Sequence, residues 1–158
     1  GCLRRHPRRY RARRVAMDGH TRERIVERTK YIRESLTILA DIRDEISFAT
    51  YRTDRRTRDI VEREFQTTIE ACLDIGTMIL REKSQSVPET NAAVFRQLAA
   101  AGVVDDELGR RMAEAAGFRN ILAHQYGSEI DDRDVYNVLQ HELDVFSTYL
   151  RQIRANLD

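Results

Sequence analysis

Apolar side chains recur at intervals of three and four residues in two stretches of the first half of the chain, the spacing that places them on one face of an α-helix. The first stripe predicts one long helix, and its members are Ile25, Thr29, Ile32, Leu36, Leu39, Ile42, Ile46 and Ala49. The second predicts a helix over about 57–83, and its members are Val61, Phe65, Ile69, Cys72, Gly76 and Ile79. Residues 51–56 lack a stripe and are interpreted as a polar connection.

Three further helices are predicted in the second half, over about 91–101, 105–126 and 131–153. Proline before a helix and glycine after it are usual limits, and carboxylates in a first turn favour the positive end of the helix dipole. These signals are Pro88, Gly102, Asp105, Asp106, Glu107, Gly127, Asp131, Asp132 and Asp134. The last helix has its own stripe of Val135, Val138, Glu142, Val145, Phe146, Tyr149 and Ile153.

Four long amphipathic helices and one short helix predict an all-α protein, an antiparallel four-helix bundle with one additional short helix. Its length of 158 residues suits one domain, and only two prolines and seven glycines argue against a β-sandwich or barrel. With 41% hydrophobic and 34% charged residues, the chain is neither disordered nor fibrous. Gly76 interrupts the second helix at a cost of about 1 kcal/mol relative to alanine, so a neighbouring backbone is expected to approach it closely.

Charge is distributed unevenly. Residues 1–16 contain no acid and seven arginines, which are Arg4, Arg5, Arg8, Arg9, Arg11, Arg13 and Arg14. Subtracting these seven from the net charge of +1 leaves −6 for residues 17–158. Such a leader could tether nucleic acid, because clustered guanidinium groups displace counterions from phosphates. Met17 and the change in composition instead favour a cloning remnant or upstream read-through, with residues 17–158 as the single helical domain.

The sequence gives no sign of a bound cofactor, a metal site or a membrane span. No apolar run approaches the roughly 20 residues of a membrane span, and none follows the arginines as in a secretion signal, so a cytoplasmic protein is expected. Cys72 on an apolar helical face is expected to be a small buried thiol, and His141 an ordinary surface residue. The four histidines lack metal-ligand spacing, so neither a metal nor a cofactor is expected.

The segment 117–127, GFRNILAHQYG, concentrates the candidate chemistry. On a helix that advances about 100° per residue, Arg119 falls inside an apolar arc formed by Leu108, Met112, Ala115, Leu122 and Ala123. An unpaired buried arginine is costly, so it must pair with a carboxylate or face a wet cleft. A structural salt bridge to Glu70 or Asp74 is one interpretation, and an anion-binding site is the other.

Two neighbouring side chains favour a site. Asn120 and His124 are four residues apart and share a helix face, where the amide could orient the imidazole. Arg119 and His124 are five apart and point about 140° away from each other, so two copies around a two-fold axis are expected to present them to a shared groove. Tyr126 lies near the helix end with an accessible hydroxyl suited to hydrogen bonding or modification. A purely structural polar cluster remains an alternative.

The pattern Arg119-Asn120-x-x-x-His124-x-Tyr126 near the end of the penultimate helix resembles the HepT family of the HEPN superfamily. The similarity extends to PETNAAVFRQLAAAGVVDDELGRRMAEAAGF over 88–118 and VEREFQTTIEACLDIG over 61–76, and it covers essentially residues 17–158. The arginine-rich leader is the one departure.

This resemblance implies the toxin of a type II toxin–antitoxin pair, a homodimeric and metal-independent endoribonuclease with an MNT-type nucleotidyltransferase as antitoxin. In that family's terms, His124 would be the general base or acid for attack of a 2′-hydroxyl on the adjacent phosphodiester of RNA. Arg119 would hold the phosphate, Asn120 would fix the substrate or the imidazole, and Tyr126 would be the tyrosine that the antitoxin modifies with AMP.

Two other classes of protein would use the same residues without catalysing a reaction. The dimer could be a nucleotide-binding or substrate-presenting subunit of a two-component nucleotidyltransferase, in which Arg119 and His124 only bind phosphate. It could also be a helical interaction module whose polar cluster sets the register of a dimer. The module predicts a buried carboxylate partner for Arg119 and no open groove beside it.

Overall fold

The computed structural model describes residues 17–157, which form seven α-helices, one 3₁₀ helix and no strand. The elements are α2 (Gly19–Glu45), α3 (Phe48–Thr53), α4 (Arg55–Glu82), α5 (Asn91–Ala100), α6 (Asp106–His124), η2 (Gly127–Glu129), α7 (Asp132–His141) and α8 (Leu143–Arg154). The predicted all-α fold is confirmed. The expectations for the arginine-rich leader, residues 1–16, lie outside the described part of the chain.

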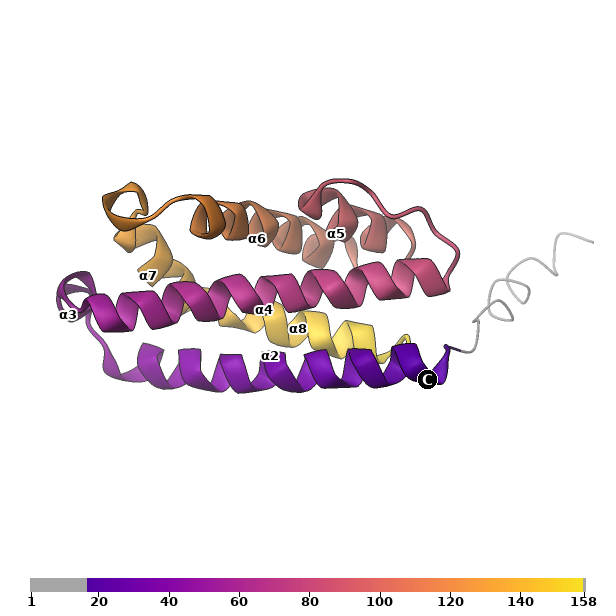
Figure 1. The fold of residues 1–158 in the computed structure, drawn as a ribbon, viewed down its shortest axis with the longest axis horizontal. Helices are drawn as coiled ribbons and strands as arrows, with labels where there is room; N and C mark the ends of the chain where they lie inside the picture. Colours follow the sequence, from indigo (N-terminus) through magenta and orange to yellow (C-terminus); the bar gives the residue numbers. More distant parts are fainter. Residues whose placement is uncertain (1–16, 158) are drawn as a thin grey trace, which may run out of the picture.

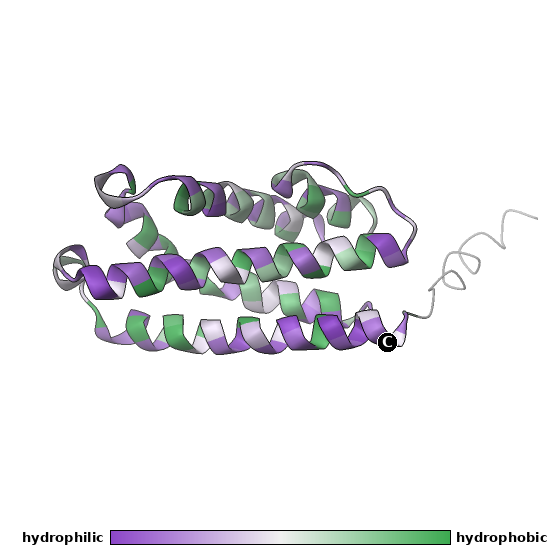
Figure 2. Ribbon diagram, viewed as in Figure 1, coloured by the Kyte–Doolittle hydropathy of each residue, from purple (hydrophilic) through white to green (hydrophobic). Residues whose placement is uncertain are grey.

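The long helices α2 and α4 lie side by side and run in opposite directions, with the small helix α3 at the turn between them (Figure 1). Helices α6 and α8 complete the bundle, and α5 packs on the first part of α6. Hydrophobic positions alternate with longer hydrophilic stretches along the helices (Figure 2). Among the helices of residues 17–157, none is both long and apolar enough to cross a membrane.

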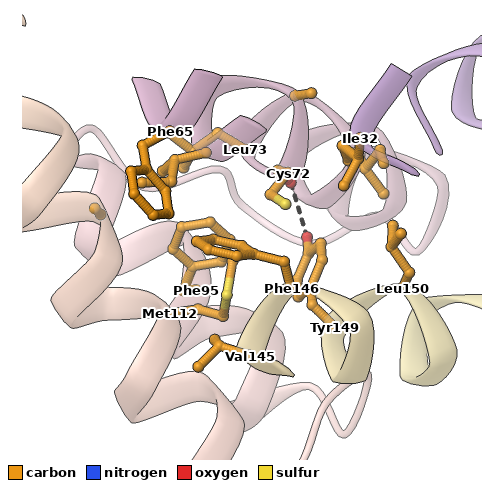
Figure 3. Close-up of a cluster of buried hydrophobic side chains, with 14 of the residues drawn as sticks. Ile32, Phe65, Cys72, Leu73, Phe95, Met112, Val145, Phe146, Tyr149 and Leu150 are labelled. Atoms are coloured by element: carbon orange, nitrogen blue, oxygen red, sulfur yellow. Dashed lines mark hydrogen bonds between the residues drawn. The ribbon is translucent and has the colours of Figure 1, made fainter. Parts of the chain in front are cut away.

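Aromatic side chains fill the centre of the bundle. The Phe65 ring contacts Phe118 of α6 and Phe146 of α8, with ring centroids 5.5 Å and 6.4 Å apart. Tyr149 is fully buried, and its hydroxyl donates a 2.8 Å hydrogen bond to the carbonyl oxygen of Cys72 (Figure 3). Cys72 is itself completely buried, as predicted, and burial raises the pKa of its thiol.

Gly76 allows side chains, rather than a backbone, to approach α4. A Cβ atom at this position would lie 2.7 Å from Cδ1 of Leu98 and 3.0 Å from the hydroxyl oxygen of Tyr149. The prediction that a backbone approaches Gly76 is therefore wrong: the groups that lie close are side chains of α5 and α8. The expected backbone contact occurs instead at Gly109, where a Cβ would lie 3.3 Å from the carbonyl oxygen of Phe95.

The interpretation of residues 51–56 as a polar connection is wrong. The first long helix ends at Glu45, and Phe48–Thr53 form α3. The hydroxyl of Ser47 caps α3 by accepting from the Thr50 N–H at 3.2 Å, which supplies a start signal that the apolar pattern does not contain. Tyr51 is fully buried, and its ring lies 5.7 Å from that of Tyr136 in α7, so α3 closes this end of the core.

The last predicted helix is two helices, because the chain bends at Glu142 between α7 and α8. Glu142 occupies a stripe position, but its carboxylate accepts a 2.7 Å hydrogen bond from Arg111 of α6 and does not enter the core. The bend allows α7 and α8 to bury separate faces, Val135 and Leu139 in one and Phe146 and Tyr149 in the other. His141, in the last turn of α7, is exposed as predicted.

Candidate active site

Helix α6 carries all of the candidate residues except Tyr126, which follows the helix. It begins after Asp105, whose carboxylate accepts the Leu108 N–H at 2.7 Å. This hydrogen bond and a second one from Gln152 lower the pKa of Asp105. The helix ends at His124, two residues before the predicted end, and the chain becomes extended at Gln125. Gly127 then turns the chain with a φ of 61°, so the predicted stop acts just beyond the helix.

Arg119 lies where the helical periodicity places it, on the side of α6 that faces α4. Its neighbour Phe118 packs edge-to-face on Phe65, and this contact fixes the register between the two helices. The guanidinium then contacts Glu70, which lies five residues beyond Phe65 on α4. Nε and Nη2 both donate to Oε1 of Glu70, at 3.1 Å and 2.8 Å. The predicted carboxylate partner is therefore Glu70, whereas Asp74 pairs with Arg28 of α2 at 3.2 Å.

The ion pair between Arg119 and Glu70 is accessible to solvent. The Arg119 side chain is 23% exposed and that of Glu70 is 35% exposed. Both line an open cavity of about 280 Å³ between α4, α6 and the segment that leads into α5. The other lining residues are Leu73, Asp74, Thr77, Val87, Pro88, Asn91 and Val94. Arg119 is the single cation among these lining residues of the described chain, so it is the group that can bind an anion there.

Asn120 contacts Arg119 and not the imidazole. Its side-chain oxygen accepts from Nη1 of Arg119 at 3.3 Å. Within residues 17–157 no hydrogen bond joins Asn120 to His124, so the expected orientation of the imidazole by the amide is absent from the single chain. The amide instead extends the polar contacts of the guanidinium toward the exposed face of α6.

His124 and Tyr126 both lie on the surface at the end of α6. His124 occupies the last helical turn and is exposed, and Tyr126 is 80% exposed, as predicted for an accessible phenol. Ile121, on the same stretch of α6, is 44% exposed although it is apolar. One chain therefore directs Arg119 toward α4 and leaves His124 in solvent, which agrees with the divergence that their spacing predicts.

The sequence did not identify the cavity beside Arg119. Thr77 and Asn91 line it, yet neither belongs to a recognisable motif. The available signal was Pro88, which lies in the segment between α4 and α5 and lines the cavity together with Glu70. In residues 17–157, no three histidine, cysteine or acidic side chains lie close enough together to hold a metal ion.

Comparison with known proteins places these residues in a family. A family model described as Ribonuclease HepT-like matches residues 32–153, which include Arg119, Asn120, His124 and Tyr126. The chain belongs to the HepT-like ribonuclease family. The resemblance to the HepT family that the sequence predicted is thereby confirmed.

Relatives of this HepT-like chain include the mRNA nuclease HepT of Shewanella oneidensis, 30% identical over 105 residues that cover 66% of this chain and 78% of that protein. A toxin–antitoxin crystal structure with AMP-PNP contains a chain of the same fold, with a TM-score of 0.78 and 25% identity over 84% of this chain and 98% of that one. The tri-AMPylated HEPN toxin of Shewanella oneidensis, in complex with an MNT antitoxin, shares the fold at a TM-score of 0.77 and 24% identity, covering 88% and 99%.

Proposed function

We propose that this HepT-like chain is the toxin of a toxin–antitoxin pair, a metal-independent endoribonuclease whose active site is shared by two copies of the chain. The observation that carries the proposal is the half-buried guanidinium of Arg119, held beside an open cavity with part of its N–H groups accessible. Family membership and the mRNA nuclease among its relatives support the same class of reaction.

The reaction that fits these side chains is an internal transfer of a phosphodiester. The neutral imidazole of His124 accepts the proton of a ribose 2′-hydroxyl as its oxygen attacks the adjacent phosphorus. The bond from phosphorus to the 5′-oxygen of the next nucleotide then breaks, and that oxygen takes up the proton that His124 has accepted. The products are a 2′,3′-cyclic phosphate and a 5′-hydroxyl. Arg119 stabilises the charge that develops on the phosphoryl oxygens.

Two copies of the chain are needed because one copy keeps its arginine and histidine apart. Arg119 faces α4, whereas His124 lies in solvent at the last turn of α6. A two-fold axis beside the end of α6 would set the imidazole of each copy against the guanidinium of the other. The exposed Ile121 would lie within the same interface, where its apolar side chain would leave water.

The nature of the RNA ends tests the proposal. We expect the purified chain to cut RNA in the presence of EDTA and to leave 2′,3′-cyclic phosphate and 5′-hydroxyl ends, because the attacking oxygen belongs to the substrate. Mass spectrometry of the fragments and a phosphatase assay before and after acid treatment identify both ends.

Two other results would contradict the proposal. Fragments with 3′-hydroxyl and 5′-phosphate ends that disappear with EDTA would indicate a metal-dependent nuclease. Intact RNA together with tight nucleotide binding would favour the non-catalytic subunit of a nucleotidyltransferase. The same reaction with 2′-O-methyl RNA is the control, since that substrate lacks the attacking hydroxyl.

The interaction-module alternative is favoured by one observation and opposed by another. Arg119 does have a carboxylate partner, as that alternative requires. The partner, Glu70, is however one-third exposed rather than buried, and the pair lines a cavity that is open. A module that needed only a register-setting ion pair would gain nothing from a cavity at this point.

Modification of Tyr126 by an MNT-type antitoxin is the proposed means of neutralisation. The phenol is 80% exposed and lies two residues beyond His124, so an attached AMP would bring a phosphate and a nucleoside next to the catalytic groups. This anionic adduct would compete with RNA for the guanidinium of Arg119.

We expect co-expression with such a nucleotidyltransferase to add AMP to the chain, and Tyr126→Phe to remove at least one of the added groups. Intact-mass measurement counts the groups, and RNA cleavage should fall as they accumulate. Tyr136→Phe is the matched control, because the Tyr136 hydroxyl is already engaged by the carbonyl oxygen of Ile46. Unchanged AMP addition to Tyr126→Phe would exclude this tyrosine as the target.

A further inference from the structure

Oxygen Oε1 of Glu70 is the acceptor on which three donors converge. Two are Nε and Nη2 of Arg119, and the third is Nε2 of Gln66, one helical turn earlier on α4, at 3.3 Å. Gln66 and Glu70 are four residues apart, so their side chains meet on the same face of α4. The Gln66 amide therefore holds the Glu70 carboxylate from within α4, in addition to the contact that the carboxylate makes with α6.

The contact uses one particular side of the guanidinium. Arg119 has five N–H groups, of which Nε and one from Nη2 point to Glu70 and one from Nη1 points to Asn120. One N–H on each terminal nitrogen is left without a protein acceptor in residues 17–157. Two such groups are what a guanidinium needs to bind a phosphate through two parallel hydrogen bonds.

We propose that Glu70 is a positioning residue for the cleavage reaction: it holds Arg119 by its Nε–Nη2 side so that the remaining N–H groups face the cavity and the RNA phosphate. This inference rests on the proposed function. Glu70 itself does not touch the substrate. Its partial exposure gives it little importance for stability, since solvent-accessible ion pairs contribute little to folding.

The experiment must separate this positioning role from the opposite one. A carboxylate beside the phosphate-binding arginine could act as a competitor that RNA must displace. A positioning residue makes the enzyme slower when it is removed, whereas a competitor makes it faster. The neutral amide of glutamine can still accept from Nε and Nη2, so Glu70→Gln keeps the geometry and removes the charge.

The test compares Glu70→Ala, Glu70→Gln and Arg119→Ala with the unchanged chain in RNA cleavage. We expect Glu70→Ala to lower kcat by about 10- to 100-fold through misplacement of the guanidinium. KM should change less, and Glu70→Gln should recover most of the lost rate. The matched control is Glu142→Ala, which removes the carboxylate at the bend between α7 and α8 that pairs with another α6 arginine, Arg111.

Each contrary outcome has a distinct meaning. Glu70→Ala at full or increased activity, with Arg119→Ala inactive, would overturn the positioning role and leave the nuclease proposal intact. Equal losses in Glu70→Ala and Glu142→Ala that follow the folded fraction in thermal unfolding would reduce Glu70 to a structural role. An unchanged chain that cuts no RNA would overturn the nuclease proposal first, and the positioning role with it.

Discussion

Replacing His124 by alanine is expected to lower the rate of RNA cleavage by about 100- to 10,000-fold, the usual effect of losing a general acid or base. His124 carries the one imidazole at the end of α6, and imidazole is the side chain that most often serves as a general acid or base in catalysis. The measurement is single-turnover cleavage of a labelled RNA, which reports the chemical step rather than product release.

The chain contains a matched control for this change. His141 is also exposed and also lies in the last turn of a helix, α7, so His141→Ala alters charge and helix end in the same way without touching the site. The His124 imidazole makes no hydrogen bond to other residues of 17–157, so its loss should leave folding intact. Cleavage at the unchanged rate in His124→Ala would show that this histidine transfers no proton.

The starts of α5 and α6 were predictable because polar start signals accompany the apolar pattern there. Thr90 and Asp105 accept backbone N–H groups at the starts of α5 and α6. α3 was not predictable in the same way: it is six residues long, and its single buried member, Tyr51, forms no stripe. Its start depends on the hydroxyl of Ser47, which a search for apolar periodicity ignores.

The bend at Glu142 and the partner of Arg119 required the tertiary structure. Glu142 continues the apolar periodicity of the single helix predicted over 131–153, and only its ion pair with Arg111 shows that it faces α6. Glu70 and Asp74 are one turn apart on the same helix, so the sequence could not choose between them for Arg119. The packing of Phe118 on Phe65 sets the register of α6 against α4 and thereby selects Glu70.

The negative charge of residues 17–158 would restrict where RNA can bind. Residues 17–158 carry a formal charge of −6, so this part of the chain has no net attraction for RNA, and binding at the proposed site would depend on local cations. In the cavity of one chain that cation is Arg119, and Glu70 already neutralises part of its charge. Pooling the arginines of two copies would raise the local potential, so the proposed sharing of the site would also favour RNA binding electrostatically.

A heterodimer that combines Arg119→Ala in one chain with His124→Ala in the other is expected to regain roughly half of the activity of the unchanged dimer, although each variant alone is nearly inactive. The Arg119→Ala homodimer should lose about 100- to 1,000-fold, as when one donor to the transition state is removed. The mixed dimer still holds one intact arginine and one intact histidine, but on different chains. Activity can therefore return only if the two groups act across the two-fold axis.

Two different affinity tags, one on each variant, allow the heterodimer to be purified after co-expression, and native mass spectrometry confirms its composition. The informative control is a heterodimer of the unchanged chain with the double variant Arg119→Ala, His124→Ala. It also holds one arginine and one histidine, but on the same chain, and should stay nearly inactive. If this control cleaves RNA and the mixed dimer does not, the Arg119 and His124 of each site belong to the same chain. Because Arg119 faces α4 while His124 lies in solvent, that outcome would require α6 to rearrange when RNA binds.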